Sequence, residues 1–289
     1  MRHLYGIKLL KITTFFVFIG RAYQLIFWDA PYRSLLWDEK LLSPLLELLF
    51  NVEWQNYVIS LDNDFYIQRL IQFNGVFFLI CAILCLLVKS YSFKIVKTAI
   101  FFGGFLLVVL ALLEAKSKFF VFAMFFEHTI QFSLPFILLY YLKHKEIYKL
   151  ITPLKVVIAL TFLCHGLFAL GELLPLPASF VTITMNILGT TEETTIRLLF
   201  VAAVLDFIIV IGLFIPKIIK YILLYAIFWG FITAIARVLS EFIYSFSLLT
   251  MHQTFYETVF RLSHGLVPLL LYYILNFKNM FNTGDKIIN

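Results

Sequence analysis

The sequence predicts an all-α integral membrane protein with eight transmembrane helices, and three observations support this class. Hydrophobic residues make up 62% of the 289 residues and charged residues only 14%, against about half and about a quarter in a soluble domain. Eight apolar segments approach the roughly 20 residues that a spanning helix needs. The remaining residues are too few for a soluble catalytic domain. A soluble enzyme, a disordered chain and a disulfide-rich secreted module are therefore excluded.

The eight apolar segments are rich in Leu, Ile and Phe. A backbone in lipid must satisfy its own hydrogen bonds, so we expect each segment to form a helix. The N-terminal segment resembles a signal peptide, but Arg21 interrupts it and no small-x-small cleavage site follows, so we predict a retained span. The predicted spans cover about residues 9–28, 69–88, 97–115, 119–142, 153–174, 197–215, 218–243 and 257–277.

Two connections are too long to be simple turns. Residues 29–68 mix Leu, Trp and charged residues, which is typical of amphipathic helices lying on a membrane surface. Residues 175–196 are expected to form a shorter re-entrant or surface element. Both lie on the outer side of the predicted topology, where such segments close a cavity.

Basic residues concentrate on one side of the predicted spans, which sets the orientation by the positive-inside rule. With both termini in the cytoplasm, that side has 14 basic residues against the acids Glu146 and Asp285. We therefore predict a multi-pass protein of a bacterial inner membrane, with no nucleic-acid partner. The 14 residues are Arg2, Lys8, Lys11, Lys89, Lys94, Lys97, Lys143, Lys145, Lys149, Lys155, Lys217, Lys220, Lys278 and Lys286.

The two halves of the chain, residues 1–149 and 150–289, resemble each other. The third span opens with KIVK at Lys94 and the seventh with KIIK at Lys217. The fourth ends with PFILLYYL from Pro135 and the eighth with PLLLYYIL from Pro268. Each half has an even number of spans, so the pattern predicts two parallel four-helix repeats about an axis along the membrane normal. Chance similarity between Leu-rich and Phe-rich helices is the alternative.

Ionisable side chains inside a membrane span are costly and usually face the interior of the bundle. This chain has several, most of them in the outer half of the predicted spans. The candidate catalytic residues are His165, His128, His264, Glu127 and Asp206. The candidate substrate-binding residues are Arg21, Gln24, Gln131, Arg237 and Glu172. We expect these side chains to line a polar pocket that opens outward under the two surface segments.

Each candidate also has a purely structural interpretation. Arg21 would pair with Glu127 or Asp206, and Arg237 with Glu241 or Glu114. Glu172, seven residues after His165, is predicted to share its helix face or to be solvated near the surface. Three histidines at comparable depth favour a proton relay, a quinone contact or a metal over simple packing, because imidazole both donates and accepts near neutral pH. The spacings H-x-x-x-H and H-E-x-x-H are absent, which disfavours a metal.

Several of these residues carry a resemblance to a known family. The second half, from Leu163-Cys164-His165-Gly166 through Arg197 and Asp206 to the last span, resembles a DoxX-like four-helix membrane module. The first half, with Gly20-Arg21-Ala22 and its Trp-containing outer segment, resembles a diverged second copy. Some DoxX-like proteins are linked to quinone-dependent thiol or thiosulfate oxidation, so the resemblance implies a quinone as the cofactor class.

Three function classes fit these observations. A quinone-linked redox protein would use the histidines for hydrogen bonding and proton transfer and Arg21 to stabilise negative charge. A transporter would bind a small or lipid-like anion at Arg21 and couple it through Glu127 or Asp206. The expected absence of broken, Gly/Pro-interrupted helices counts against it. A non-catalytic membrane subunit would dock a periplasmic or membrane partner through residues 29–68 and 175–196.

Overall fold

The computed structural model describes residues 2–284, with side chains for residues 5–276. Within that range every regular element is a helix, as the composition predicts. Asp285 and Lys286 of the charge count lie outside the described residues, as do the side chains of Arg2 and Lys278. The elements are α1 (Arg2–Phe27), α2 (Arg33–Leu36), α3 (Glu39–Phe50), α4 (Trp54–Val58), α5 (Leu61–Leu87), α6 (Lys94–Ser117), α7 (Phe122–Glu127), α8 (Thr129–His144), η1 (Ile147–Leu150), α9 (Ile151–Leu170), α10 (Ala178–Leu188), α11 (Glu192–Gly212), α12 (Ile219–Ser240), η2 (Tyr244–Phe246), α13 (Ser247–Arg261) and α14 (Ser263–Gly284).

Seven helical stretches among the described residues are long and apolar enough to cross a membrane. They confirm a multi-pass helical membrane protein, one stretch short of the eight spans expected from sequence. The fourth expected span, residues 119–142, is not a single helix, because it is divided into α7 and the 16-residue α8. The seven stretches are Tyr5–Phe27, Leu61–Leu87, Lys94–Ser117, Ile147–Leu170, Glu192–Gly212, Ile219–Ser240 and Tyr244–Asn276.

Both halves contain a broken helix, which corrects the expectation that they would not. The first break lies at His128 between α7 and α8, and the second at Leu262 between α13 and α14. A proline follows within α8 at Pro135 and within α14 at Pro268. Proline has no N–H and its ring crowds the carbonyl four residues earlier, which weakens the helix just after each break.

Side chains bond the backbone groups that the breaks leave open. At the first break, Thr129 donates to the Phe126 carbonyl (2.6 Å), and the Ile130 amide donates to Thr161 Oγ1 on α9 (3.2 Å). At the second, Ser263 donates to the Phe260 carbonyl (2.8 Å). A buried backbone donor or acceptor without a partner is costly, so these hydroxyls make the breaks tolerable inside the bundle.

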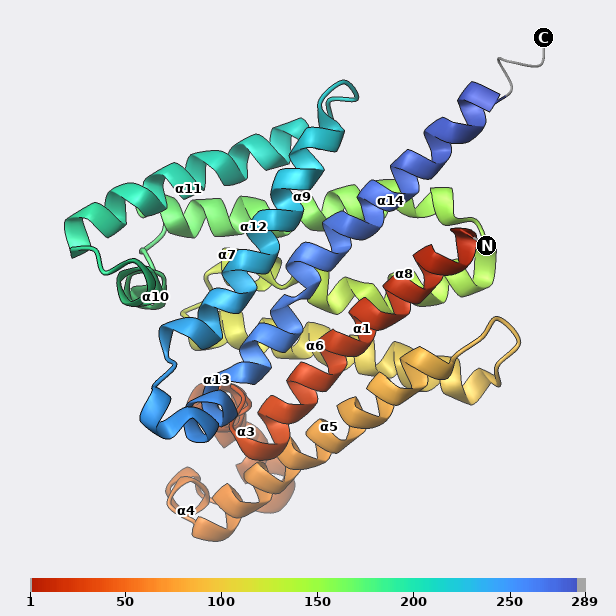
Figure 1. The fold of residues 1–289 in the computed structure, drawn as a ribbon. Coiled ribbons are helices and arrows are strands. Elements are labelled where there is room, and N and C mark those ends of the chain that lie inside the picture. Colours follow the sequence, from red (N-terminus) through yellow and green to blue (C-terminus); the bar gives the residue numbers. More distant parts are fainter. Residues whose placement is uncertain (1, 285–289) are drawn as a thin grey trace.

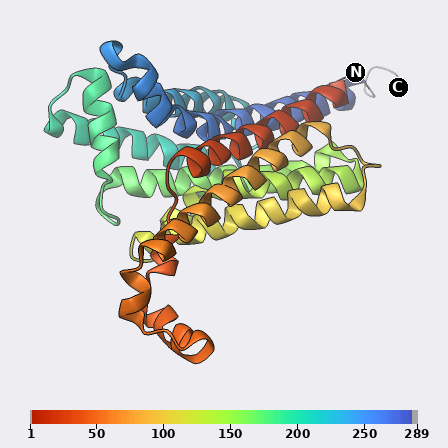
Figure 2. The same ribbon diagram turned by 90° about the horizontal axis from the view of Figure 1, so that it is seen from below.

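The helices pack in consecutive pairs and then across the two halves. Helix α1 packs against α5, α6 against α8, α9 against α11 and α12 against α14. Across the halves, α1 packs against both α13 and α14, and α9 against both α7 and α8. The start of α1, the end of α14 and the α5–α6, α8–η1 and α11–α12 connections lie at one end of the bundle (Figures 1 and 2).

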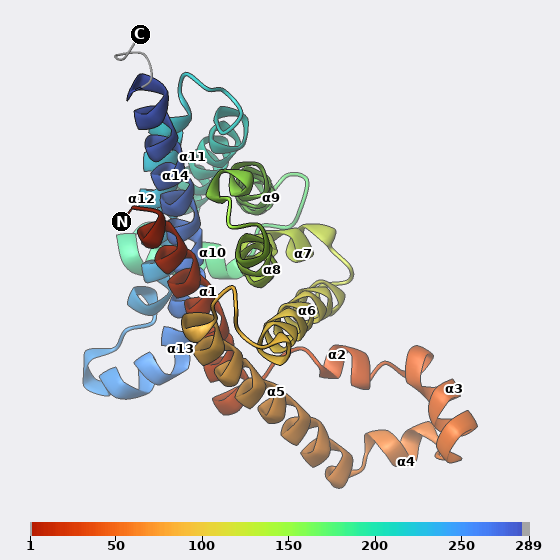
Figure 3. The same ribbon diagram turned by 90° about the vertical axis from the view of Figure 1, so that its right-hand side faces the viewer.

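The two long connections lie at the other end. Helices α2, α3 and α4 form an arm that extends away from the bundle (Figure 3). Along α3 the apolar side chains of Leu45, Leu48 and Leu49 are exposed, as the amphipathic pattern predicts. By contrast, α10 packs on α11 and α12 and covers the space between them. The first break, the start of α10 and the end of α13 therefore meet in the same part of the bundle.

Candidate functional site

A cluster of buried and half-buried charges lies between the first break and α13. Three arginines each approach one glutamate on another helix. Arg21 Nη1 is 3.9 Å from Glu114 Oε1, Arg237 Nη1 is 3.6 Å from Glu257 Oε2, and Arg261 Nη2 is 3.7 Å from Glu127 Oε1. At these distances the charges attract but the atoms are beyond hydrogen-bond range. The charge of the three arginines is thus balanced, while space remains between the partners.

Arg21 on α1 is the most constrained of these side chains, with 3% of its surface exposed. It donates from Nη1 to Gln24 Oε1 (2.7 Å) and from Nη2 and Nε to Gln131 Oε1 (2.9 and 3.2 Å). Its guanidinium carbon lies 4.0 Å from the centre of the Phe260 ring. The structure therefore brings Arg21, Gln24 and Gln131 together, although Arg21 pairs with Glu114 rather than with Glu127 or Asp206.

The histidine at the first break lies beside this cluster. His128 Nδ1 is 2.7 Å from the Met124 carbonyl, and its Nε2 is 3.8 Å from Glu127 Oε1. A carbonyl only accepts, so Nδ1 carries the proton and Nε2 of the neutral ring faces the carboxylate as an acceptor. At 3.8 Å the ring and the carboxylate lie close together without a hydrogen bond between them.

The six paired charges line a cavity of about 190 Å³. Gln24, His128, Phe180 and Tyr256 complete much of its wall. A cavity of this size with many polar groups has room for several water molecules. We assign it as a polar chamber around the three ion pairs.

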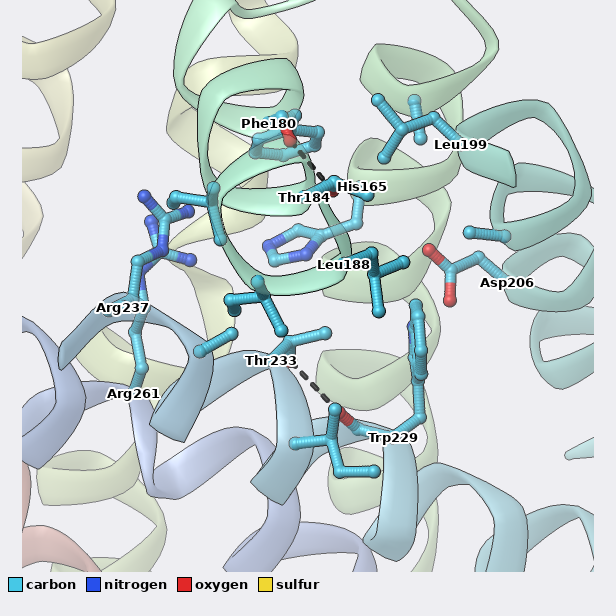
Figure 4. Close-up of a pocket in the computed structure, with 16 residues that line it drawn as sticks. His165, Phe180, Thr184, Leu188, Leu199, Asp206, Trp229, Thr233, Arg237 and Arg261 are labelled. Carbon is cyan, nitrogen blue, oxygen red and sulfur yellow. Dashed lines mark hydrogen bonds between the residues drawn. The ribbon is translucent and has the colours of Figure 1, made fainter. Parts of the chain in front are cut away.

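A second cavity, of about 260 Å³, adjoins the first and shares Phe180, Arg237 and Arg261 with it. Its wall comes from α9, α10, α11, α12 and α13 and is mainly apolar. Figure 4 shows the His165 ring between the two arginines on one side and Asp206 on the other. We call this the α10 cavity, because α10 supplies Phe180, Ile183, Thr184, Ile187 and Leu188 to its wall.

Polar atoms without a protein partner gather at the α10 cavity. His165 Nε2, Asp206 Oδ1 and Arg261 Nε are fully buried, make no hydrogen bond within the described residues, and belong to side chains that line it. His264 Nε2 is also buried without a hydrogen-bond partner, and the centre of the His264 ring lies 5.3 Å from the centre of the His165 ring. Leaving a buried polar group unsatisfied costs about 1–3 kcal/mol. Each of the four calls for a partner, which ordered water or a bound molecule would supply.

The pairing predicted for Arg237 is wrong, as is the one predicted for Arg21, and of the two alternatives for Glu172 the solvated one agrees with the structure. Glu172 does not share a helix face with His165, because α9 ends at Leu170 and Gly171 adopts φ +74°, a left-handed conformation that stops the helix. Glu172 is exposed outside the helix. Arg237 pairs with Glu257 rather than with Glu241 or Glu114.

Several residues of the site escaped the sequence analysis. Glu257 stands four positions before Arg261, a spacing that places two side chains on one helix face and would have indicated it. Nothing in the sequence marked Phe180 and Trp229 as site residues, because aromatic residues are common throughout the chain. Among the described residues no group of three His, Cys, Asp or Glu side chains is placed to hold a metal ion.

Helices, breaks and buried charges together define a multi-pass membrane protein with two adjoining internal cavities. No protein-family model matches the chain, and no curated protein or solved structure matches it either. The likeness to DoxX-like proteins accordingly stays a prediction from the residues named above.

Proposed function

We propose that the protein is a membrane carrier for a small amphipathic molecule, bound in the α10 cavity. The unpartnered atoms of His165, Asp206 and Arg261 carry this proposal. Arg261 Nε–H is always a donor, so the head group of the molecule accepts a hydrogen bond, as a carbonyl or carboxylate does. The apolar wall suits the rest of the molecule. A volume of about 260 Å³ is just below the roughly 300–1,000 Å³ of typical ligand pockets.

The two broken helices support movement of that molecule as well as binding. Carriers built from repeats place their substrate at discontinuous helices in corresponding positions of the two halves. Here the breaks at His128 and Leu262 lie seven and six residues before the matched prolines, Pro135 and Pro268. Glu127 and Arg261, which approach each other to 3.7 Å, flank these breaks. A change at either break would therefore alter the charges around the substrate.

The proposed architecture is eight crossings in two parallel repeats, with α7 and α8 together forming the fourth. Corresponding helices have corresponding neighbours, which supports it. Helix α1 packs on α5, α13 and α14, and α9 packs on α11, α7 and α8. The chain ends would lie in the cytoplasm, since the basic residues of the inner connections cluster at that end. The membrane would be a bacterial inner membrane.

Quinone-linked redox chemistry is the second candidate, and the adjacent His165 and His264 rings favour it. A quinone carbonyl would accept a hydrogen bond from Arg261 Nε–H, and from His165 in the tautomer that has the proton on Nε2, while the imidazoles would provide a route for protons. The aromatic rings of Phe180 and Trp229 on the cavity wall would contact a flat ligand. Both candidates use the same cavity and differ in what happens to the bound molecule.

The test is to purify the full chain gently from its native membrane and to identify extracted small molecules by mass spectrometry. Wild type is expected to carry about one equivalent of an amphipathic compound with a carbonyl or carboxylate. His165→Leu is expected to lose it, and His144→Leu, which changes an exposed histidine outside the cavity, is expected to keep it. Equal occupancy in both variants would contradict the assigned site.

The fate of the bound compound separates the candidates. Exchange of the labelled compound across proteoliposomes indicates a carrier. A quinone that is reduced on the protein without crossing the membrane indicates a redox function. An empty extract together with a stoichiometric protein partner would instead support a membrane subunit that docks through the arm of α2–α4 and through α10.

A further inference from the structure

A third cavity lies at the end of the bundle away from the α10 cavity. It is an open cleft of about 580 Å³ between the α5–α6 connection, the start of α6 and the end of α8. The end of α8 and the α5–α6 connection lie at the same end of the bundle as the start of α1 (Figure 1). None of its residues belongs to the two cavities described above.

The charge of this cleft has one sign. Four lysines line it, namely Lys94, Lys97, Lys143 and Lys145. No acidic residue does so among the described residues. Lys97 is further held in place because its Nζ donates to the Ser90 carbonyl. The cleft is thus concave and positively charged, and Ser90, Tyr91 and Thr98 also line it.

Helix electrostatics do not account for the lysines of α6. Lys94 and Lys97 occupy the first turn of that helix, where the macrodipole disfavours a positive charge. An anion placed between them would be attracted both by the lysines and by the helix N-terminus. Lys143 and Lys145 lie at the C-terminal end of α8, where the helix macrodipole favours a positive charge. They would complete the other side of the anion site.

The floor and outer edge of the cleft are apolar. Phe101, Leu139 and Leu142 line it next to the lysines, and 55% of the Phe101 surface is exposed. Phe101 lies one helical turn from Lys97 and thus further along α6, toward the middle of the bundle. The cleft therefore offers positive charge at the end of the bundle and an apolar surface where a hydrocarbon chain would run.

We propose that this cleft binds the phosphate head group of an anionic phospholipid, with an acyl chain lying along Phe101. Basic pockets between membrane helices are a common way of recognising such lipids. The site is separate from the α10 cavity, and the proposal does not depend on the carrier function.

Topology alone explains why lysines occur at this end, so the test needs a control with equal charge. The chain provides one in the second half. Lys217 and Lys220 repeat the KIIK spacing of Lys94 and Lys97, yet they do not line the cleft. Lys94→Gln/Lys97→Gln and Lys217→Gln/Lys220→Gln remove the same charge from the full chain. A general effect of charge would weaken lipid binding in both variants. A specific site would weaken it in Lys94→Gln/Lys97→Gln alone.

The experiment is native mass spectrometry of the full chain in detergent micelles, titrated with phosphatidylglycerol or phosphatidylcholine. Wild type is expected to prefer phosphatidylglycerol by about tenfold or more. Lys94→Gln/Lys97→Gln is expected to lose most of that preference, and Lys217→Gln/Lys220→Gln to keep it within about twofold of wild type. Thermal unfolding of both variants in the same micelles is measured to show that each is folded.

Three results would overturn the proposal. The first is equal binding of the two lipids by wild type, and the second is an equal loss in both double variants. The third is competition by glycerol phosphate at the concentrations at which phosphatidylglycerol binds. That result would assign the cleft to a soluble phosphate compound, because it would show that the acyl chain adds nothing to binding.

Discussion

The imidazole rings of His165 on α9 and His264 on α14 lie 5.3 Å apart, and Nε2 of each is buried without a hydrogen-bond partner. His264 Nδ1 is 2.9 Å from the Arg261 carbonyl, so Nδ1 carries the proton and Nε2 of the neutral ring is an acceptor. Two helices of the second half of the chain, far apart in sequence, thus present unsatisfied imidazole nitrogens to one region. This relationship is the strongest indication of a binding site in the molecule.

The first prediction separates a binding role of His165 from a packing role. Replacing a buried polar group that lacks a partner by an apolar group of similar size is close to neutral for stability. We therefore expect His165→Leu to change the free energy of unfolding, measured in micelles after the ligand is extracted, by less than about 1 kcal/mol. The same variant should lose the copurifying ligand. A large destabilisation would show that the imidazole holds the helices together.

The second prediction concerns the support of Arg21. Gln131→Leu removes the acceptor of two Arg21 N–H groups in a buried site, which should destabilise the protein by about 1–3 kcal/mol. Gln72→Leu is the control, because Gln72 also accepts from an arginine, Arg69, but at the surface (2.9 Å), and its amide makes one long bond to the Ile26 carbonyl (3.5 Å). It should change stability by less than about 0.5 kcal/mol in the same thermal unfolding assay. Equal effects would contradict the buried role of Gln131.

The third prediction tests the close approach of α12 to the second break. A Cβ at Gly230 would lie 2.4 Å from the His264 carbonyl oxygen and 2.7 Å from the Gly265 nitrogen, so α12 and α14 would have to separate. We expect Gly230→Ala to destabilise by about 1–3 kcal/mol and to reduce ligand retention.

The matched control for Gly230 is Gly212→Ala. Its Cβ would meet the side chains of Ile222 and Ile218, which can rotate, rather than backbone atoms. Its effect on unfolding should be smaller, and ligand retention should be unchanged. If Gly212→Ala destabilised as much as Gly230→Ala, backbone contact at the break would not be the cause.

The fourth prediction concerns pH and the arm of α2–α4. Asp38 lies outside the spanning segments, and its hydrogen bond with Lys116 on α6 holds the pKa of the carboxyl below its usual value. A carboxylate with a lowered folded-state pKa stabilises the fold above its unfolded pKa, about 3.9. That contribution is lost as the pH falls through the folded-state pKa.

We therefore expect the arm to detach from α6 only below about pH 4. Fluorescence of Trp37, beside Asp38, is the measurement, with the other tryptophans replaced by Phe. Asp38→Asn should abolish the acid transition, and Asp62→Asn, an exposed acid at the start of α5, should leave it in place. An unchanged transition in Asp38→Asn would assign it to another group.

Much of the helical architecture could be predicted from the sequence, because a backbone in lipid must satisfy its own hydrogen bonds and apolar segments therefore form helices. The apolar runs predicted the long helices, and the matched prolines in the two halves marked the helices that prove to be broken. The breaks themselves were not predicted. A proline only weakens a helix, and the break at His128 also depends on Thr161, which comes from α9 and is 31 residues away from Ile130 in the chain.

The sequence by itself determined the class of the protein, the place of most spans and the set of polar residues in them. Those features follow from the cost of exposing polar groups to lipid, which acts on each segment separately. The tertiary structure alone decided that Arg21 pairs with Glu114, that Arg237 pairs with Glu257, and that His165 and His264 face one region. These choices depend on the rotation and approach of whole helices, which packing between distant segments determines.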